Sequence, residues 1–132
     1  TSNLSNDQYT EQQLAVDPHI WLDPVNAKII TNRIVKILSE YELSYFEKAR
    51  DPSRFLAMRF AAKEATSKAL GTGFKQGVYP CLISVEHAPS GKPSLKVSGK
   101  VLQLFSEFKI KQSHISLSDD GGFAFASVIL EL

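Results

Sequence analysis

The chain has 132 residues, which is enough for one domain and too few for two ordinary ones. It is 43% hydrophobic and 22% charged, and fifteen basic against fourteen acidic residues give a net charge of +1, which excludes bulk attraction to nucleic acid as its main property. No apolar run could span a membrane, and no signal peptide is recognisable. The single cysteine, Cys81, excludes an internal disulfide. We therefore expect a soluble, cytoplasmic, single domain without nucleic-acid or membrane partners.

The N-terminal part of the chain carries one helix-start signal. Residues 1–14 are polar and show no periodicity, and we interpret them as a tail. Asp23 is followed by Pro24, a pair that is typical of a helix N-cap and the first helical position. Four aliphatic side chains then recur at helical spacing and predict a helix at about 24–38: Ile30, Ile34, Ile37 and Leu38.

Two further helices are predicted by the residues at their ends. Ser39 and Glu42 form a capping-box pattern, so we expect a short helix at about 40–49. Asp51-Pro52 repeats the combination of a cap with a proline and opens the longest helix. Gly71 and Gly73 are expected to end it.

The periodicity changes after Gly73, where alternating hydrophobic residues indicate strands. Residues 81–87 and 94–98 are predicted as two strands, joined by a turn at 89–92. A short amphipathic helix at 99–108 follows them.

The last part of the chain predicts a second hairpin. Residues 113–118 and 123–130 are expected to be strands, and Asp119-Asp120-Gly121-Gly122 is interpreted as their turn rather than as a metal-binding pair. Helices followed by antiparallel strands predict an α+β fold. Four phenylalanines of this half are expected in the core: Phe105, Phe108, Phe123 and Phe125.

The segment from residue 48 to residue 75 differs from the rest in charge. It contains seven basic and two acidic residues, a net charge of +5. Glu64 and Lys68 are spaced i, i+4 and share one face of the predicted helix, which leads into Gly71 and Gly73, where backbone could approach a ligand closely. Two interpretations remain open: a polyphosphate site in which the carboxylate binds Mg²⁺, or an ordinary pair on the surface of a helix.

The same segment, RFLAMRFAAKEATSKALGTGF, resembles the signature of the holo-acyl-carrier-protein synthases, the small bacterial 4′-phosphopantetheinyl transferases. The resemblance includes LSEYEL before it and the closing HISLSDDGGFAFASVIL, so it covers roughly residues 38–132. It rests on these positions of the signature: Arg54, Phe55, Arg59, Phe60, Lys63, Glu64, Lys68, Gly71 and Gly73. The resemblance implies the α+β fold of the 4′-phosphopantetheinyl transferases, in which an antiparallel sheet packs against a long helix.

The resemblance implies a chemistry as well as a fold. Such enzymes transfer the 4′-phosphopantetheine of coenzyme A to a serine of an apo acyl carrier protein, and they are usually homotrimers with active sites between subunits. By position in the signature, Glu64 would bind Mg²⁺ and Lys68 would lie beside the reacting phosphates. His114 would lie near the coenzyme, as would the backbone at Gly71 and Gly73. Three cations would bind nucleotide phosphates or the acidic carrier protein: Arg54, Arg59 and Lys63.

The N-terminal segment departs from this family. The family begins with a strand whose Asp is a second metal ligand, whereas residues 15–38 read AVDPHIWLDPVNAKIITNRIVKIL and resemble a fragment of the metal-binding lipoproteins of zinc or manganese importers. The chain is therefore interpreted as a possible chimera with a junction near residues 38–41. Asp17 is the candidate to replace the missing ligand, while Asp23 is better explained as a helix cap and His19 as a surface histidine.

Two functions follow from these observations. The first is the Mg²⁺-dependent transfer of phosphopantetheine by a single domain of residues 1–132, in which residues 39–132 form the transferase-like region. The alternative is a catalytically inactive protein that binds coenzyme A or the carrier protein, because the Asp of the family's first strand is missing.

Overall fold

The computed structural model describes residues 36–132. The expected tail at 1–14 and most of the helix expected at 24–38 lie outside the described residues, as do Asp17, His19 and Asp23.

The first described helix, α3 (Glu40–Phe46), begins at the predicted capping box. The Ser39 hydroxyl accepts a hydrogen bond from the Glu42 backbone N–H at 3.2 Å, and the Glu42 carboxylate accepts one from the Ser39 N–H at 2.9 Å. Two N–H groups that a helix leaves unpaired at its start are thereby satisfied. The helix ends three residues before the predicted position 49.

The long helix α4 (Pro52–Leu70) has the predicted ends. Asp51 accepts a hydrogen bond from the Arg54 N–H at 3.1 Å, and Pro52 occupies the first turn, where its missing N–H costs no helical bond. Gly71 ends the helix in the left-handed conformation with φ of 80°. Glycine adopts this conformation without the steric penalty that a Cβ atom would bring.

Two antiparallel hairpins follow, as predicted, but Cys81 and Leu82, which were expected in the first strand, lie in a 3₁₀ turn before it. A 3₁₀ turn, η2 (Pro80–Leu82), leads into β1 (Ile83–His87), which pairs with β2 (Pro93–Val97) so that Ile83 lies opposite Val97. The helix α5 (Gly99–Glu107) connects this hairpin to the second one.

The second hairpin is formed by β3 (Gln112–Asp120) and β4 (Phe123–Glu131). Asp120 lies opposite Phe123, so the loop between them has two residues. Gly121 and Gly122 both have positive φ, at 56° and 82°, which is what a two-residue type I′ turn requires.

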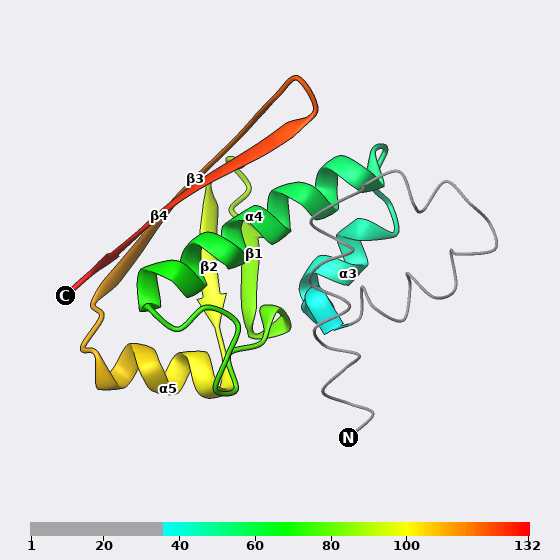
Figure 1. Ribbon diagram of the computed structural model, residues 1–132. Helices are drawn as coiled ribbons and strands as arrows, with labels where there is room; N and C mark the ends of the chain where they lie inside the picture. Colours follow the sequence, from blue (N-terminus) through cyan, green and yellow to red (C-terminus); the bar gives the residue numbers. More distant parts are fainter. Residues whose placement is uncertain (1–35) are drawn as a thin grey trace.

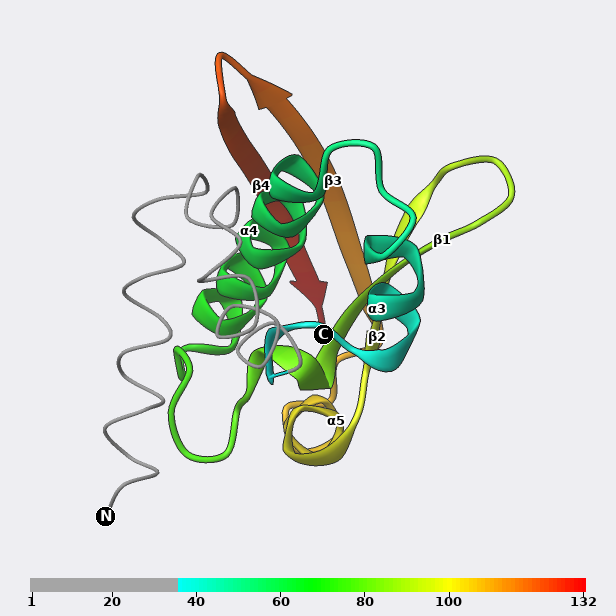
Figure 2. The same cartoon turned by 90° about the vertical axis from the view of Figure 1, so that its right-hand side faces the viewer.

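Helix α4 lies across both hairpins and contacts β1, β3 and β4, as Figures 1 and 2 show from two directions. The hairpins form two separate two-stranded sheets instead of the single sheet that we expected. Strands β2 and β3 are neighbours in space, yet no strand ladder joins them. The fold is nevertheless α+β, with antiparallel strands packed against a long helix.

The described core has two parts. One lies between α3 and α4 and contains Ile37, Leu38 and Leu56. The other lies between the end of α4, β1 and α5: Leu70, Val78, Ile83, Val101 and Leu104. None of the helices in residues 36–132 is both long and apolar enough to cross a membrane.

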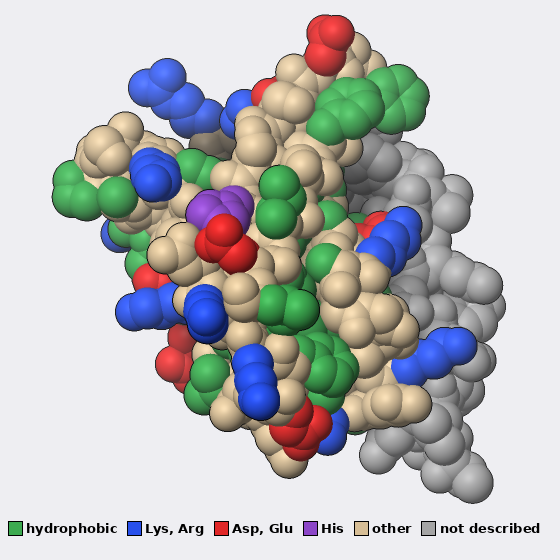
Figure 3. All heavy atoms as spheres, turned by 90° about the vertical axis from the view of Figure 1, so that its left-hand side faces the viewer, with side chains coloured by type: hydrophobic (Ala, Val, Ile, Leu, Met, Phe, Trp, Pro, Cys, Tyr) green, Lys and Arg blue, Asp and Glu red, His purple; other side chains and the backbone are tan. Residues whose placement is uncertain are grey.

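The expectation for the four phenylalanines is correct only for Phe105, which packs against the second part of the core. Phe108 is exposed, and so are Phe123 and Phe125, which stand on the outer face of β4. Figure 3 views the molecule from the hairpin's side and shows hydrophobic side chains exposed among charged ones on that face. The alternation of β4 identifies two faces of a strand, but it does not say which one packs inward.

Candidate active site

Helix α4 carries five of the side chains that the sequence identifies as site residues. It is one regular helix of 19 residues between its two caps. Arg54 and Arg59 lie on its first half, and Lys63, Glu64 and Lys68 on its second half. Because the rise is about 1.5 Å per residue, Arg54 and Glu64 are separated by roughly 15 Å along the axis.

Glu64 and Lys68 form the expected pair on the surface of α4. The Glu64 carboxylate and the Lys68 ammonium lie 2.9 Å apart, and their side chains are 43% and 72% exposed. The Ser67 hydroxyl donates to the Glu64 carbonyl at 2.8 Å and leaves the carboxylate free for other contacts. An exposed pair of this kind contributes little to stability, but it leaves the Lys68 ammonium accessible to a phosphate and the Glu64 carboxylate accessible to a cation.

The chain leaves α4 through an exposed loop that contains Gly71 and Gly73. The N–H groups of Thr72 and Gly73 both donate to the Ser67 carbonyl, at 3.2 and 3.1 Å. Gly71 and Gly73 have positive φ, and no heavy atom lies within 4 Å of the position that a Cβ would take. This backbone is therefore open to a ligand beside the end of the helix that presents Lys68.

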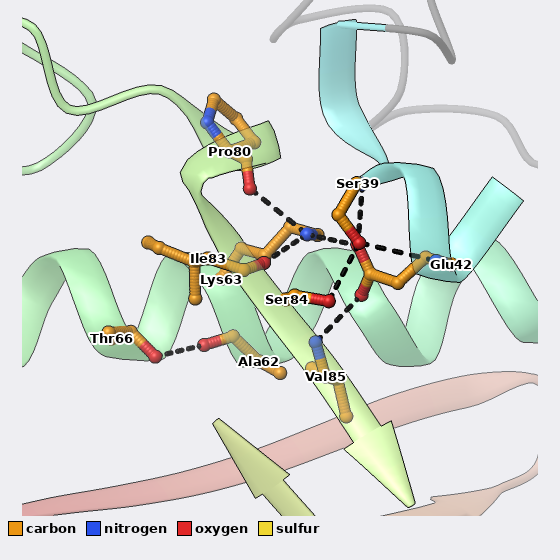
Figure 4. A network of polar contacts seen from close by, with 9 residues as sticks. All are labelled: Ser39, Glu42, Ala62, Lys63, Thr66, Pro80, Ile83, Ser84 and Val85. Atoms are coloured by element: carbon orange, nitrogen blue, oxygen red, sulfur yellow. Dashed lines mark hydrogen bonds and ion pairs between the residues drawn. The ribbon is translucent and has the colours of Figure 1, made fainter. Parts of the chain in front are cut away.

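Lys63 does not belong to this surface, which corrects the prediction that it binds a phosphate. Its side chain is completely buried, and its ammonium group lies 2.6 Å from the Glu42 carboxylate. It also donates to the carbonyls of Pro80, at 3.0 Å, and Ile83 (Figure 4). All three N–H bonds are used inside the protein, so none remains for a ligand.

The buried pair satisfies the free edge of β1. The Glu42 carboxylate accepts a hydrogen bond from the Val85 N–H at 3.0 Å, while Lys63 donates to the Ile83 carbonyl on the same edge. The hydroxyl of Tyr41 accepts from the His87 N–H at 3.3 Å. Side chains of α3 and α4 thus take the place of a neighbouring strand along β1.

Burial lowers the pKa of Lys63 from its ordinary value, and the Glu42 carboxylate opposes that shift. Glu42 is a partner that the sequence did not reveal. Its role as the capping residue of α3 was predicted, but its contact with a lysine 21 positions away was not. The capping bond uses Oε1, which also accepts from Lys63, and Oε2 remains for Val85.

Arg59 is half-buried between α4 and β1. Its guanidinium lies 4.0 Å from the centre of the Phe55 ring, and one of its terminal nitrogens lies 3.4 Å from Nδ1 of His87. Its Nε is buried and has no hydrogen-bond partner in the described part of the chain. Burial lowers the pKa of His87 because the charged imidazole loses solvation, and the positive charge of Arg59 lowers it further by repulsion.

Arg54 is paired with the tip of the second hairpin. Its Nε lies 2.7 Å from Oδ2 of Asp119 and its Nη2 lies 2.8 Å from Oδ1. Asp119 was predicted only as a turn residue, and nothing in the sequence connects it to an arginine 65 positions earlier.

The structure does not join His114 to the pair on α4. His114 stands on β3, and its Nε2 lies 3.5 Å from the Glu131 carboxylate across the hairpin. No hydrogen bond or ion pair within residues 36–132 links it to Glu64 or Lys68. The same residues contain no group of three or more His, Cys, Asp or Glu side chains that could hold a metal ion.

Comparisons with known proteins identify the family of the chain. Residues 21–126 match the family described as the 4′-phosphopantetheinyl transferase superfamily. We expected the resemblance to begin at about residue 38, but this match begins at residue 21. The chain is 48% identical over 96 residues to a holo-[acyl-carrier-protein] synthase of Vibrio cholerae, which covers 73% of this chain and 76% of that protein.

Solved structures with the same fold include two holo-[acyl-carrier-protein] synthases. The holo-[acyl-carrier-protein] synthase of Neisseria meningitidis superposes with a TM-score of 0.75 and 34% identity, over 82% of this chain and 86% of that one. The corresponding enzyme of Helicobacter pylori, solved in complex with coenzyme A, gives a TM-score of 0.69 and 28% identity, over 81% and 88%.

Proposed function

The chain belongs to the 4′-phosphopantetheinyl transferase superfamily, and we propose that it transfers the 4′-phosphopantetheine group of coenzyme A to a serine of an apo acyl carrier protein. The Vibrio cholerae relative is named a holo-[acyl-carrier-protein] synthase, which supports this reaction. The Helicobacter pylori enzyme was solved in complex with coenzyme A, which supports coenzyme A as the donor. The observation in this chain that carries the proposal is the exposed Glu64–Lys68 pair beside the open backbone of Gly71 and Gly73.

The proposed reaction is a phosphoryl transfer. The serine oxygen of the carrier protein forms a bond to the phosphorus that bears the pantetheine arm, and the proton of the serine hydroxyl passes to solvent water. The bond from that phosphorus to the bridging oxygen breaks, and adenosine 3′,5′-bisphosphate leaves. Positioning and stabilisation of the phosphate charge supply most of the catalysis in such reactions.

Each proposed site residue has a part in this scheme. Lys68 neutralises charge on the reacting phosphates, and the backbone at Gly71 and Gly73 lies against the coenzyme. His114 contacts the coenzyme from the second hairpin. Arg59 and Arg54, on the first half of α4, bind phosphate or the acidic carrier protein.

Glu64 is proposed to hold a Mg²⁺ ion. Magnesium prefers oxygen ligands and is commonly bound by one or two carboxylates together with substrate phosphates and water. One exposed carboxylate beside a phosphate-binding lysine fits that chemistry. When bound, the ion would polarise the phosphate oxygens. Asp17 is the proposed second carboxylate ligand.

The exposed face of the second hairpin supports a homotrimeric assembly. Phe123, Phe125 and Ile129 lie at alternate positions on the outer side of β4, and these residues are 70%, 55% and 62% exposed. Large hydrophobic residues on one face of a strand are typical of a surface that a partner covers, and a further copy of this chain is the proposed partner. We place the reaction in the cytoplasm, since a lone cysteine fits a reducing compartment.

A mass-spectrometric assay tests the reaction. Apo carrier protein incubated with the enzyme, coenzyme A and Mg²⁺ is expected to gain the mass of one phosphopantetheine group. The Glu64→Gln variant should lose at least ~100-fold in rate, because it keeps the shape of the side chain and removes its charge. Glu107→Gln, the same change on α5, is the matched control and should remain active.

Three outcomes would count against parts of this proposal. A wild-type rate in Glu64→Gln would remove Glu64 from the site. Coenzyme A binding without any mass gain would support the inactive binding protein instead. Coenzyme A affinity that is the same with and without Mg²⁺, measured by calorimetry, would contradict the metal.

A further inference from the structure

The contact between Arg54 and Asp119 joins two distant elements. Arg54 stands in the first turn of α4, and Asp119 lies two residues before the turn of the second hairpin. Two parallel hydrogen bonds of 2.7 and 2.8 Å connect the Nε and Nη2 edge of the guanidinium to both oxygens of the carboxylate. The side chains are 56% and 37% exposed, so another molecule can reach the pair.

The position of Arg54 explains why the pair forms. The start of a helix carries a partial positive charge, and a guanidinium there is repelled by it. A carboxylate at the same place offsets that repulsion and is itself stabilised. The hydrogen bonds from Arg54 accordingly lower the pKa of Asp119. At neutral pH the carboxylate is therefore ionised and available to Arg54.

The pair occupies one of the two edges through which Arg54 could bind another anion with two hydrogen bonds. Arginine binds carboxylates and phosphates most strongly through two parallel N–H bonds from one edge. Asp119 already occupies the edge formed by Nε and Nη2. An incoming anion that binds this edge must first displace Asp119, and the free energy of the internal pair is then subtracted from its affinity.

We propose that Asp119 is an internal competitor for Arg54 and thereby sets the affinity of the enzyme for its acidic carrier protein. The inference rests on the proposed function, since it concerns binding of that protein substrate. Asp119 acts through Arg54 and is a positioning residue that makes no contact with the reacting groups.

The carrier protein is the fitting anion for geometric reasons. Arg54 lies roughly 15 Å along α4 from Glu64, so it cannot contact a phosphate that Glu64 and Lys68 bind. The loop before α4 adds two exposed basic side chains, Lys48 and Arg50. Several cations spread over a surface match an acidic protein, and Arg54 contributes fully to this surface only when Asp119 is displaced.

Steady-state kinetics of Asp119→Asn test the proposal. Exposed ion pairs contribute little, so the KM for apo carrier protein should fall by about two- to five-fold at low salt. The KM for coenzyme A should stay the same, and the change should be confined to KM rather than kcat. The effect should shrink at high salt because both charges are exposed.

Two variants separate competition from general charge. Asp120→Asn removes the same charge from the adjacent residue, which lies on the opposite face of β3 and does not bond Arg54. It should change the KM by less than Asp119→Asn does. In an Arg54→Gln background, Asp119→Asn should not change the KM further, because the guanidinium for which Asp119 competes is absent.

The KM values of these variants distinguish competition for Arg54 from the alternatives. An unchanged or raised KM for the carrier protein in Asp119→Asn would overturn the inference. Equal effects of Asp119→Asn and Asp120→Asn would also overturn it, because the change in KM would then come from net charge and not from competition for Arg54. A lower KM for coenzyme A alone would assign the pair to the coenzyme. Failure of the wild type to modify the carrier protein would instead refute the proposed function.

Discussion

Lys63 and Glu42 form the one ion pair in residues 36–132 in which both side chains are completely buried. Removing one member leaves the other charge unpaired in the interior, which is strongly destabilising. We therefore expect Lys63→Met to lower the free energy of unfolding by about 3–5 kcal/mol, measured by urea denaturation. The same variant removes hydrogen bonds from the Pro80 and Ile83 carbonyls.

The double variant Glu42→Gln/Lys63→Met is the control for this prediction. The Gln carbonyl can still accept one backbone N–H bond, and no unpaired charge remains in the core. Stability should therefore recover in part relative to Lys63→Met, since neutral replacements of buried pairs are often tolerated. A loss below about 1 kcal/mol in Lys63→Met would show that the pair is not buried as described.

His87 predicts a dependence of stability on pH. Burial, together with the neighbouring Arg59, lowers the pKa of His87 below its usual value. The unfolded chain therefore takes up this proton at a higher pH than the folded protein does, and stability falls as the pH decreases through about 6.5. His87→Gln should lose less stability than wild type between about pH 7.5 and about pH 5.5, measured by urea denaturation at each pH. Equal losses would contradict the assigned shift.

At the scale of elements, the end of α4 depends on a glycine conformation. Gly71 has φ of 80°, and no atom would obstruct an added Cβ. We therefore expect Gly71→Ala to lower the free energy of unfolding by about 1 kcal/mol, measured by thermal denaturation, through backbone strain alone. Gly71→Asn should cost less, because asparagine tolerates the left-handed region better. Equal costs for the two variants would indicate a packing effect instead.

The positions of the elements were predicted from local signals. Asp51, Pro52 and Gly71 bound α4 as expected, and Ser39 with Glu42 opens α3. These signals work because capping bonds involve residues three or four positions apart, whose geometry is determined by the helix itself. The C-terminal end of α3 has no such signal, and there the predicted boundary was three residues too late.

At the scale of the whole molecule, the second hairpin is the proposed site of assembly. Its inner face presents small side chains such as Ala124 and Ala126 on the side of β4 that packs against α4, while the phenylalanines point outward. We expect Phe125→Asp to convert the proposed trimer to a monomer, since a charge cannot be buried at a hydrophobic interface without cost. Light scattering after size exclusion gives the mass directly.

Phe108→Asp is the matched control, because Phe108 is also exposed but lies at the end of α5. It should leave the mass of the assembly unchanged. Circular dichroism would show whether either variant remains folded. A wild-type chain that is monomeric at all concentrations would contradict the proposed assembly, and a trimeric Phe125→Asp would exclude this face as its interface.

Local signals in the sequence predict the ends of α4, the turn at Gly121-Gly122, the α+β class and, through RFLAMRFAAKEATSKALGTGF, the family. Each of these depends on residues that are close in the chain, where spacing specifies geometry. Two contacts depend on the packing of distant elements: Lys63 points into the core, and Arg54 is paired with Asp119. Lysines and arginines of one basic helix look equivalent in a sequence. Their roles differ because the packing of α4 against β1 and the second hairpin buries one cation and brings a distant carboxylate to another.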